Sequence, residues 1–188
     1  MIFIAEVKTL SPYGFESKKS WDKLFEIANE YGDWISIHVD SRWGGGTHLL
    51  EKARKLTTKP ILAKGYHLTD AKLKSSFDAG ADYCLVVNRI PPKKYASKCL
   101  MELNEEDCFE EFMGLDDSLK CVCNRRQLWN GMMTNLENYK FRFDIMKALG
   151  LWTCQASKIK NKSDVFPKAD AILVGEHLPT FAPKFRQK

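Results

Sequence analysis

Eight short apolar runs recur along the chain, and most of them are separated by segments with helical periodicity. Apolar runs without polar alternation are typical of strands that are buried on both faces of a sheet. Strands joined through crossover segments pair in parallel, so the pattern implies a closed or doubly wound parallel sheet. The runs are IFIAEV (2–7), WISIHV (34–39), PILAK (60–64), DYCLVV (82–87), KCLMEL (98–103), LKCVCN (119–124), LWTCQA (151–156) and DAILVG (170–175). We therefore predict an α/β fold, a single (β/α)8 TIM barrel domain over residues 1–188.

The segments between the runs predict the outer helices of such a barrel. In the first of them, apolar residues recur at i, i+3, i+4 and i+7, as on one face of a helix. The predicted helices cover residues 20–32, 47–56, 69–80, 105–114 and 135–150. Barrels of this type usually reach about 250 residues, so a chain of 188 residues requires a minimal version. We expect shortened crossovers four (88–97) and seven (near 163–166), and a reduced last helix over 178–188 that its prolines break.

Composition excludes several classes of function. The net charge is only +5 and the basic residues are scattered, which does not indicate a nucleic-acid groove but suits an anionic small molecule. No apolar run is long enough to span a bilayer, and the N-terminus does not resemble a secretory signal. The six cysteines lack paired CxxC spacing and the four histidines are dispersed, so we predict reduced core thiols and no metal site. These features favour a cytoplasmic protein without a nucleic-acid or membrane partner.

Polar residues follow the predicted strands, where the active sites of such barrels are built. Two lysines and two carboxylates at one rim are costly to bury unless they pair with one another or act on a ligand. A structural ion-pair network would explain any one of them, whereas the whole set favours a functional site. The rim residues are Glu6, Lys8, Ser11, Lys64, Glu102, Asn104, Asn124, Arg126, Ser157, Gly175 and Glu176.

Six motifs in order along the chain resemble one enzyme family, the indole-3-glycerol phosphate synthases. IAEVKTLSP is similar to the family's IAE-x-K-x-x-SP first strand, and ISIHVDSRWGGGTHLL to its second strand and aromatic–glycine loop. KPILAKGYHLTDAKLKSSFDAGADYCLVV resembles the L-x-KDF and AGAD region, and CLMELNEEDCFE the fifth strand with its glutamate. CVCNRRQL is similar to NxRDL, and DAILVGEHL to LVGESL. The resemblance spans residues 1 to about 178.

The resemblance implies a carboxy-lyase that needs no cofactor. The family closes the indole ring of 1-(2-carboxyphenylamino)-1-deoxyribulose 5-phosphate with decarboxylation and dehydration, a step of tryptophan biosynthesis. By motif position, Lys64 would be the general acid at the substrate carbonyl, and Glu102 the general base or acid of the dehydration. Lys8 would hold the substrate carboxylate or serve as a second acid, and Glu6 would orient Lys8.

The resemblance also implies the residues that bind the substrate. Asn124 and Arg126 would position the anthranilate end and the hydroxyls. Trp43 and Tyr66 are either aromatic walls for the substrate ring or ordinary packing under a loop. The phosphate site would use backbone N–H donors and hydroxyls, from Ser11, Ser157, Gly175 and Glu176.

The chain also departs from the family's pattern. The family's seventh strand ends in ESG, where this chain has Ala156 for the glutamate and Lys158 for the glycine. Gln155 is adjacent, but strand alternation directs it to the opposite face. Gly65 and Gln127 each replace a family aspartate. The family's N-terminal extension over the barrel mouth is not part of this sequence, so we expect a more open mouth that admits water.

These departures leave alternatives open. An active synthase is one hypothesis, and a catalytically altered barrel that acts on another phosphosugar, or only binds a phosphorylated ligand, is the other. Phosphoribosylanthranilate isomerase shares the fold, but its early KxCG motif is absent. We expect His38 to be a packed strand residue, and we assign no role to His67 or His177 near the rim. Trimmed crossovers that expose apolar barrel wall would favour self-association.

Overall fold

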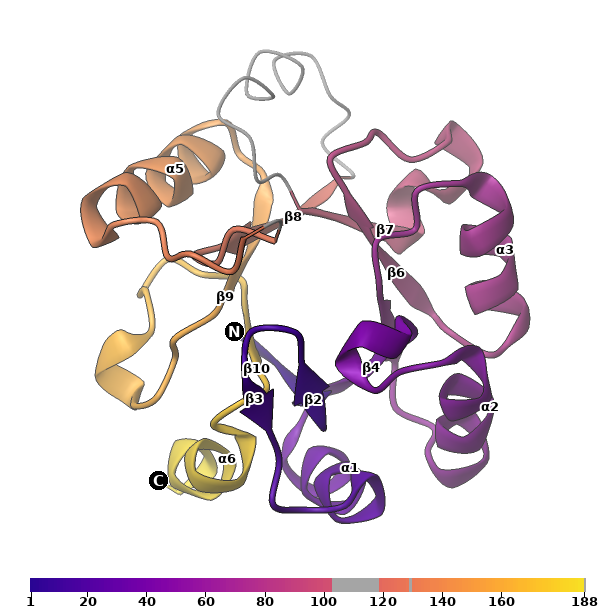
Figure 1. Cartoon of the computed structure of the whole chain (residues 1–188). Coiled ribbons are helices and arrows are strands. Elements are labelled where there is room, and N and C mark those ends of the chain that lie inside the picture. Colours follow the sequence, from indigo (N-terminus) through magenta and orange to yellow (C-terminus); the bar gives the residue numbers. More distant parts are fainter. Residues whose placement is uncertain (103–118, 129, 188) are drawn as a thin grey trace.

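The eight predicted strands form one closed barrel in which every neighbouring pair is parallel. The computed structural model describes residues 1–102, 119–128 and 130–187. Figure 1 shows the barrel with its helices outside the strands. The strands are β1 (Ile2–Val7), β4 (Trp34–His38), β5 (Ile61–Lys64), β6 (Tyr83–Val87), β7 (Cys99–Glu102), β8 (Lys120–Asn124), β9 (Trp152–Ala156) and β10 (Ala171–Val174). The predicted TIM barrel is thus confirmed, with each strand within a residue of its apolar run.

Helices cover the outside of the barrel in the segments that the periodicity indicated (Figure 1). The side chains of Ser20, Thr69 and Asn135 each accept a hydrogen bond from a backbone N–H of the first helical turn, which fixes where three of these helices begin. The helices are α1 (Trp21–Tyr31), α2 (Thr47–Leu56), α3 (Asp70–Asp78), α5 (Leu136–Ala148) and α6 (Leu178–Arg186). The helix predicted over 105–114, and Asn104 before it, lie outside the described residues.

Crossovers four and seven are short, as predicted. Each contains only one 3-10 helix, η2 (Lys93–Lys98) or η4 (Lys162–Asp164). The last helix, α6, is also short, but the expectation that prolines break it is wrong, because α6 continues through Pro183. A proline inside a helix removes one backbone hydrogen bond. Packing of Phe181 and Phe185 against the Phe3 ring, with ring centroids 5.7 and 5.4 Å away, offsets that loss.

Alternation along the strands divides the barrel interior into an apolar floor and a polar mouth. Successive side chains of a strand point to opposite faces, so residues two apart share the interior. Leu62, Leu100 and Val122 belong to a buried cluster inside the barrel, together with Ile4 and Leu173. Each of the strands that carry these residues continues toward the mouth, and Glu6, Lys64, Glu102, Asn124 and Gly175 stand two positions further along.

Three aromatic rings stack inside the opposite end of the barrel. The Trp34 ring lies 4.2 Å from the Tyr83 ring and 6.1 Å from the Trp152 ring, and both pairs are nearly parallel. These rings extend the apolar floor, since Trp34 is buried and the other two pack against the inner cluster. The interior is therefore a packed core that leaves room for polar chemistry only at the mouth.

A two-stranded hairpin that the sequence analysis did not predict follows β1. Its strands, β2 (Leu10–Ser11) and β3 (Phe15–Glu16), are antiparallel. Gly14 has φ of +83°, a left-handed conformation that glycine adopts readily in a turn. Two-residue strands are too short to show a periodicity in the sequence. The hairpin carries Tyr13 to the barrel mouth.

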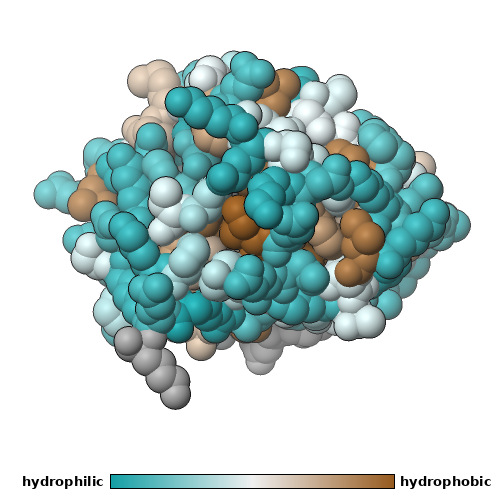
Figure 2. All heavy atoms as spheres, turned by 90° about the horizontal axis from the view of Figure 1, so that it is seen from below, coloured by the Kyte–Doolittle hydropathy of each residue, from teal (hydrophilic) through white to brown (hydrophobic). Residues whose placement is uncertain are grey.

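The surface over α1 and α6 is mainly hydrophilic, with separate hydrophobic spots (Figure 2). On this face the two helices, which pack on each other and on β1, cover the apolar barrel wall. Large exposed apolar side chains occur elsewhere, among them Met132 and Phe141. Self-association stays a prediction. Within the described part of the chain, no helix has both the length and the apolar composition needed to cross a membrane.

Truncation of Phe181 tests whether α6 is an integral part of the core. Phe181 is 1 % exposed, whereas Phe141 on α5 is 67 % exposed. We expect Phe181→Ala to lower the free energy of unfolding by about 3–5 kcal/mol, because a buried ring leaves a cavity. Phe141→Ala is the matched control and should change it by less than about 0.5 kcal/mol. Urea denaturation measures both, and equal effects would contradict the packing of α6.

Candidate active site

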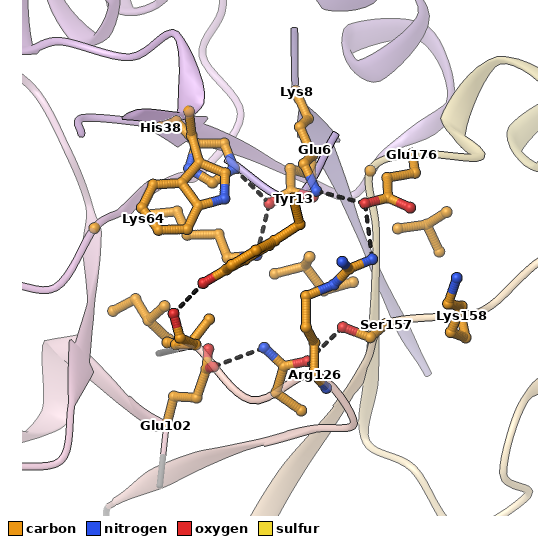
Figure 3. Close-up of a pocket in the computed structure, with 18 of the residues that line it drawn as sticks. Glu6, Lys8, Tyr13, His38, Lys64, Glu102, Arg126, Ser157, Lys158 and Glu176 are labelled. Atoms are coloured by element: carbon orange, nitrogen blue, oxygen red, sulfur yellow. Dashed lines mark hydrogen bonds and ion pairs between the residues drawn. The ribbon is translucent and has the colours of Figure 1, made fainter. Parts of the chain in front are cut away.

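A cavity of about 770 Å³, including its part open to solvent, lies at the C-terminal mouth of the barrel. This size is within the usual range for small-molecule sites. Of the predicted site residues that the structure describes, all except Ser11 line this cavity, and Figure 3 shows how those that it labels face one another. The lining residues that were predicted are Glu6, Lys8, Trp43, Lys64, Tyr66, Glu102, Asn124, Arg126, Ser157, Gly175 and Glu176.

Glu6 lies at the centre of the first cluster. Lys64 Nζ donates a hydrogen bond to Glu6 Oε1 over 2.6 Å, and His38 Nε2 lies 2.9 Å from the same oxygen. Burial disfavours the charged carboxylate, but the charge of Lys64, the close contact of His38 and the charge of Lys8 together outweigh it and hold the Glu6 pKa well below its ordinary value. Burial likewise opposes charge on Lys64, yet Glu6 and Glu102 raise its pKa. The pair is therefore ionised at neutral pH.

A second ion pair lies beside the first. Lys8 Nζ donates to Glu176 Oε1 over 2.8 Å, and Arg126 Nη2 donates to the same oxygen over 3.1 Å. Burial lowers the Lys8 pKa, while the Glu176 pKa is lowered because Lys8 and Arg126 outweigh its burial. The family resemblance implied that Glu6 orients Lys8, but in the structure Glu6 pairs with Lys64 and Lys8 pairs with Glu176. The predicted phosphate residue Glu176 thus presents a carboxylate to the cavity (Figure 3).

Glu102 lines a third wall of the cavity, apart from the two ion pairs. Its Oε1 accepts a hydrogen bond from Asn124 Nδ2 over 2.6 Å. Asn124 Oδ1 in turn accepts from the Ser157 hydroxyl and from the backbone N–H of Arg126. These bonds fix the orientation of the Asn124 amide and, through it, the buried carboxylate of Glu102.

Aromatic side chains cover part of the mouth. The Tyr13 and Tyr66 hydroxyls both donate to the backbone oxygen of Leu128. The Trp43 ring lies close to both, with its centroid 6.2 Å from that of Tyr13 and 5.8 Å from that of Tyr66. Sequence reasoning missed Tyr13 and Leu128. An aromatic residue in a Pro-Tyr-Gly turn directly after the first strand was the available signal for Tyr13.

Two backbone features shape the rim after β9 and β10: a left-handed turn and a glycine that lies very close to Glu6. Ser157 and Lys158 have φ of +69° and +57°, a left-handed conformation that is unfavourable for residues with a Cβ. A Cβ at Gly175 would lie 1.8 Å from Glu6 Oε2, so only glycine leaves room for that carboxylate. Gly175 therefore contributes to the site by admitting Glu6.

The end of β9 presents no carboxylate to the cavity. Ala156 is buried in the cluster inside the barrel. Gln155 faces outward, as strand alternation predicted, where its side-chain amide donates to Asp164 O and accepts from Phe166 N, each over 2.7 Å. The neighbouring glutamine thus does not replace the glutamate of the family motif.

The remaining predicted or considered residues have other places. Ser11 is buried in the hairpin, where its hydroxyl accepts from the backbone N–H of Tyr13. His67 is a packing residue, with hydrogen bonds to Leu85 O and Ser76 Oγ. His177 and His38 line the cavity, and His38 was not expected there. Among the residues that the structure describes, no group of three or more His, Cys, Asp or Glu is placed to hold a metal ion.

Comparisons with known proteins agree with the motifs. The chain matches no family model. It is 27 % identical to an indole-3-glycerol phosphate synthase of Sulfurisphaera tokodaii, over 93 % of this chain and 77 % of that protein. Synthases with the same name from Caldanaerobacter subterraneus and Nautilia profundicola are 30 % and 25 % identical, over 64 % and 93 % of this chain and 50 % and 73 % of theirs.

A solved structure shares the fold. KGPDC from Streptococcus mutans superimposes with a TM-score of 0.68 at 14 % identity, over 98 % of this chain and 92 % of that one. At that identity the likeness shows the barrel architecture alone.

A substitution at Gly175 tests the close approach of Glu6. We expect Gly175→Ala to lower the free energy of unfolding by about 1–3 kcal/mol, because its methyl group overpacks the carboxylate. In a Glu6→Ala background the same substitution should cost much less, since the obstructing oxygen is gone. Chemical denaturation of the four proteins in this double-mutant cycle measures the coupling. Additive effects would show that Glu6 and Gly175 are not in contact.

Proposed function

Because this chain is a divergent homologue of the indole-3-glycerol phosphate synthases, we propose that it is a carboxy-lyase of that type. It converts 1-(2-carboxyphenylamino)-1-deoxyribulose 5-phosphate into indole-3-glycerol phosphate, in tryptophan biosynthesis. The observation that carries the proposal is the placing of Lys64 and Lys8 in one cavity, each against its own carboxylate, with Glu102 on a third wall. This arrangement supplies a cationic acid and an anionic base in one enclosed site.

Lys64 is the general acid of the proposal. Its ammonium is charged and lines the cavity, so it can give a proton to the carbonyl oxygen of the substrate as the ring closes. Proton donation makes the carbonyl carbon electrophilic, and the aromatic carbon that carries the carboxylate attacks it. Carbon dioxide then leaves and the ring recovers its aromaticity.

Glu102 serves the dehydration. The hydroxyl that forms at ring closure must leave as water, and a neighbouring proton must be removed. Glu102 faces the cavity with one oxygen fixed by Asn124, so its carboxylate is held in place for proton transfer. Asn124 is a positioning residue in this scheme.

Lys8 and Arg126 bind the substrate carboxylate. In the structure both donate to one oxygen of Glu176, which demonstrates that their donors converge on a carboxylate group. A substrate carboxylate would replace Glu176 between them. Trp43 and Tyr66 then contact the anthranilate ring, and the proposal adds Tyr13 as a third aromatic contact.

The phosphate lies on the side of the cavity formed by the ends of β9 and β10. Ser157, Gly175 and Glu176 line that side. The Ser157 hydroxyl, which donates to Asn124 in the structure, would turn to the phosphate, and the backbone N–H groups of Gly175 and Glu176 would donate to it as well. Lys158 lines the same side and adds a positive charge. Ser11 is not at the cavity and has no part in this phosphate site.

A second candidate function rests on β9. Because Ala156 stands where the family motif has a glutamate, the site has fewer carboxylates for acid–base chemistry. The barrel would then act on a different phosphosugar or only bind a phosphorylated ligand. Lys64 and Glu102 are retained although this carboxylate is lost, and their presence favours the synthase reaction over this alternative.

Lys64→Met tests the general acid. We expect kcat to fall by about 100- to 10,000-fold, the usual contribution of general acid–base catalysis. Product fluorescence reports the turnover of the carboxyphenylamino substrate. Lys55→Met, at an exposed lysine on α2, should leave the rate unchanged. No turnover by the wild type at high enzyme concentration would reject the synthase reaction and leave the second candidate.

Lys158→Gly tests two properties of Lys158 separately: the strain of its left-handed backbone and the charge of its ammonium group. Glycine relieves the left-handed conformation, and we expect a gain of about 0.5–1 kcal/mol in the free energy of unfolding. Loss of the charge should raise KM about 3- to 10-fold, because an exposed cation contributes roughly 1 kcal/mol. Lys160→Gly is the control, since Lys160 has no positive φ and does not line the cavity. An unchanged KM would remove Lys158 from the phosphate site.

A further inference from the structure

His38 is a cavity residue for which the proposed reaction has no role yet. It is the last residue of β4, it is 5 % exposed, and its ring lies parallel to that of Trp43 at 5.9 Å. Because the two rings are stacked, the Trp43 ring restricts tilting of the imidazole out of its present plane. The backbone is fixed as well, because His38 O accepts from the N–H of Gly46 over 3.1 Å. His38 therefore presents Nε2 to the cavity in one orientation (Figure 3).

The Nε2 atom meets an oxygen that already has a partner. Glu6 Oε1 accepts from Lys64 over 2.6 Å, and His38 Nε2 lies 2.9 Å from the same oxygen without the alignment of a hydrogen bond, so this buried nitrogen is still without a partner. The other oxygen, Oε2, is packed against Gly175. Glu6 is 3 % exposed, so neither oxygen can turn to bulk water. Any loss of the Lys64 charge therefore makes the Glu6 carboxylate depend more on His38.

Lys64 loses its charge in the proposed reaction. Its ammonium has three N–H groups, so one can stay on Glu6 while another gives its proton to a substrate oxygen. After the transfer, the neutral amine no longer balances the buried Glu6 carboxylate, and an uncompensated buried charge is strongly unfavourable. Without further stabilisation, Glu6 would therefore oppose proton transfer from Lys64.

We propose that His38 is a positioning residue for the general acid: its Nε2–H donates to Glu6 Oε1 and holds the carboxylate while Lys64 gives its proton to the substrate. This inference rests on the proposed function of Lys64. In the step, the N–H bond of Lys64 breaks and an O–H bond forms on the substrate, and the electron pair stays on Nζ. His38 neither gains nor loses a proton. Lys64 recovers its proton from solvent water before the next turnover.

The charges around the imidazole suit a neutral donor. The charged groups near it are Glu6 on β1, Lys8 directly after β1, Lys64 on β5, and Asp40 in the segment after β4. Burial and the two lysines lower the His38 pKa and outweigh Glu6, so the ring is neutral at neutral pH. A neutral ring carries one N–H, which the proposal assigns to Nε2, the nitrogen that lies 2.9 Å from Glu6 Oε1.

Two substitutions distinguish a hydrogen-bond donor from a packing residue. His38→Leu fills the space without a donor, whereas His38→Gln keeps an N–H group near the same place. We expect His38→Leu to lower kcat about tenfold or more with KM changed less than about threefold, since the lost interaction concerns proton transfer. His38→Gln should stay within about threefold of wild type. Equal kcat values for His38→Leu and wild type, or equal losses in both variants, would overturn the proposal.

A measurement that needs no turnover completes the test. Imidazole ¹⁵N NMR at pH 7.5, with the His38 signal assigned through His38→Gln, should show the Nε2–H tautomer in wild type and in Lys64→Met. Glu6→Gln should shift that signal. An Nδ1–H tautomer would overturn the proposal even in an active enzyme. If the wild type does not turn over, the synthase function fails, and the tautomer decides whether His38 holds Glu6. Should His38→Leu not fold, His38→Met replaces it.

Discussion

The ionised carboxylate of Glu6, buried at the barrel mouth, is the constraint around which the site is organised. A buried charge is tolerated only when it is paired and hydrogen-bonded. Lys64 and His38 provide the partners on one oxygen, and glycine at position 175 leaves space for the other. Four strands, β1, β4, β5 and β10, therefore meet at one side chain. Closure of the barrel therefore brings together the residues that surround Glu6.

The opposite end of the barrel explains why this charge can be maintained. Below the mouth, the inner positions of the strands are apolar, and the stacked rings of Trp34, Tyr83 and Trp152 lie at the far end. This floor stabilises the barrel by burial, so the mouth is free to carry groups that do not stabilise it. The low dielectric of the floor also strengthens the interactions between the charges above it.

Strand positions and mouth residues could be predicted because both follow from short-range rules. Apolar runs mark the strands, and a period of two directs Glu6, Lys64 and Glu102 inward. The partners of these residues could not be predicted. Glu6 belongs to β1 and Lys8 comes directly after that strand, so the two are close in sequence. Between Glu6 and Lys64 stands β4, and their contact depends on how the closed barrel curves. The unbroken α6 was missed for a similar reason, since its packing on Phe3 joins the two ends of the chain.

The two lysines differ in how easily their carboxylates can be exchanged. Glu6 is enclosed on both oxygens, whereas the Glu176 side chain remains one-fifth exposed and belongs to the segment that follows β10. A substrate anion that enters the mouth can displace Glu176 toward solvent, but it cannot displace Glu6. We infer that Lys8 and Arg126 exchange one carboxylate for another, while Lys64 keeps its counterion and is available for proton transfer. The division of labour between an anion-binding lysine and an acidic lysine thus follows from the depth at which each carboxylate is buried.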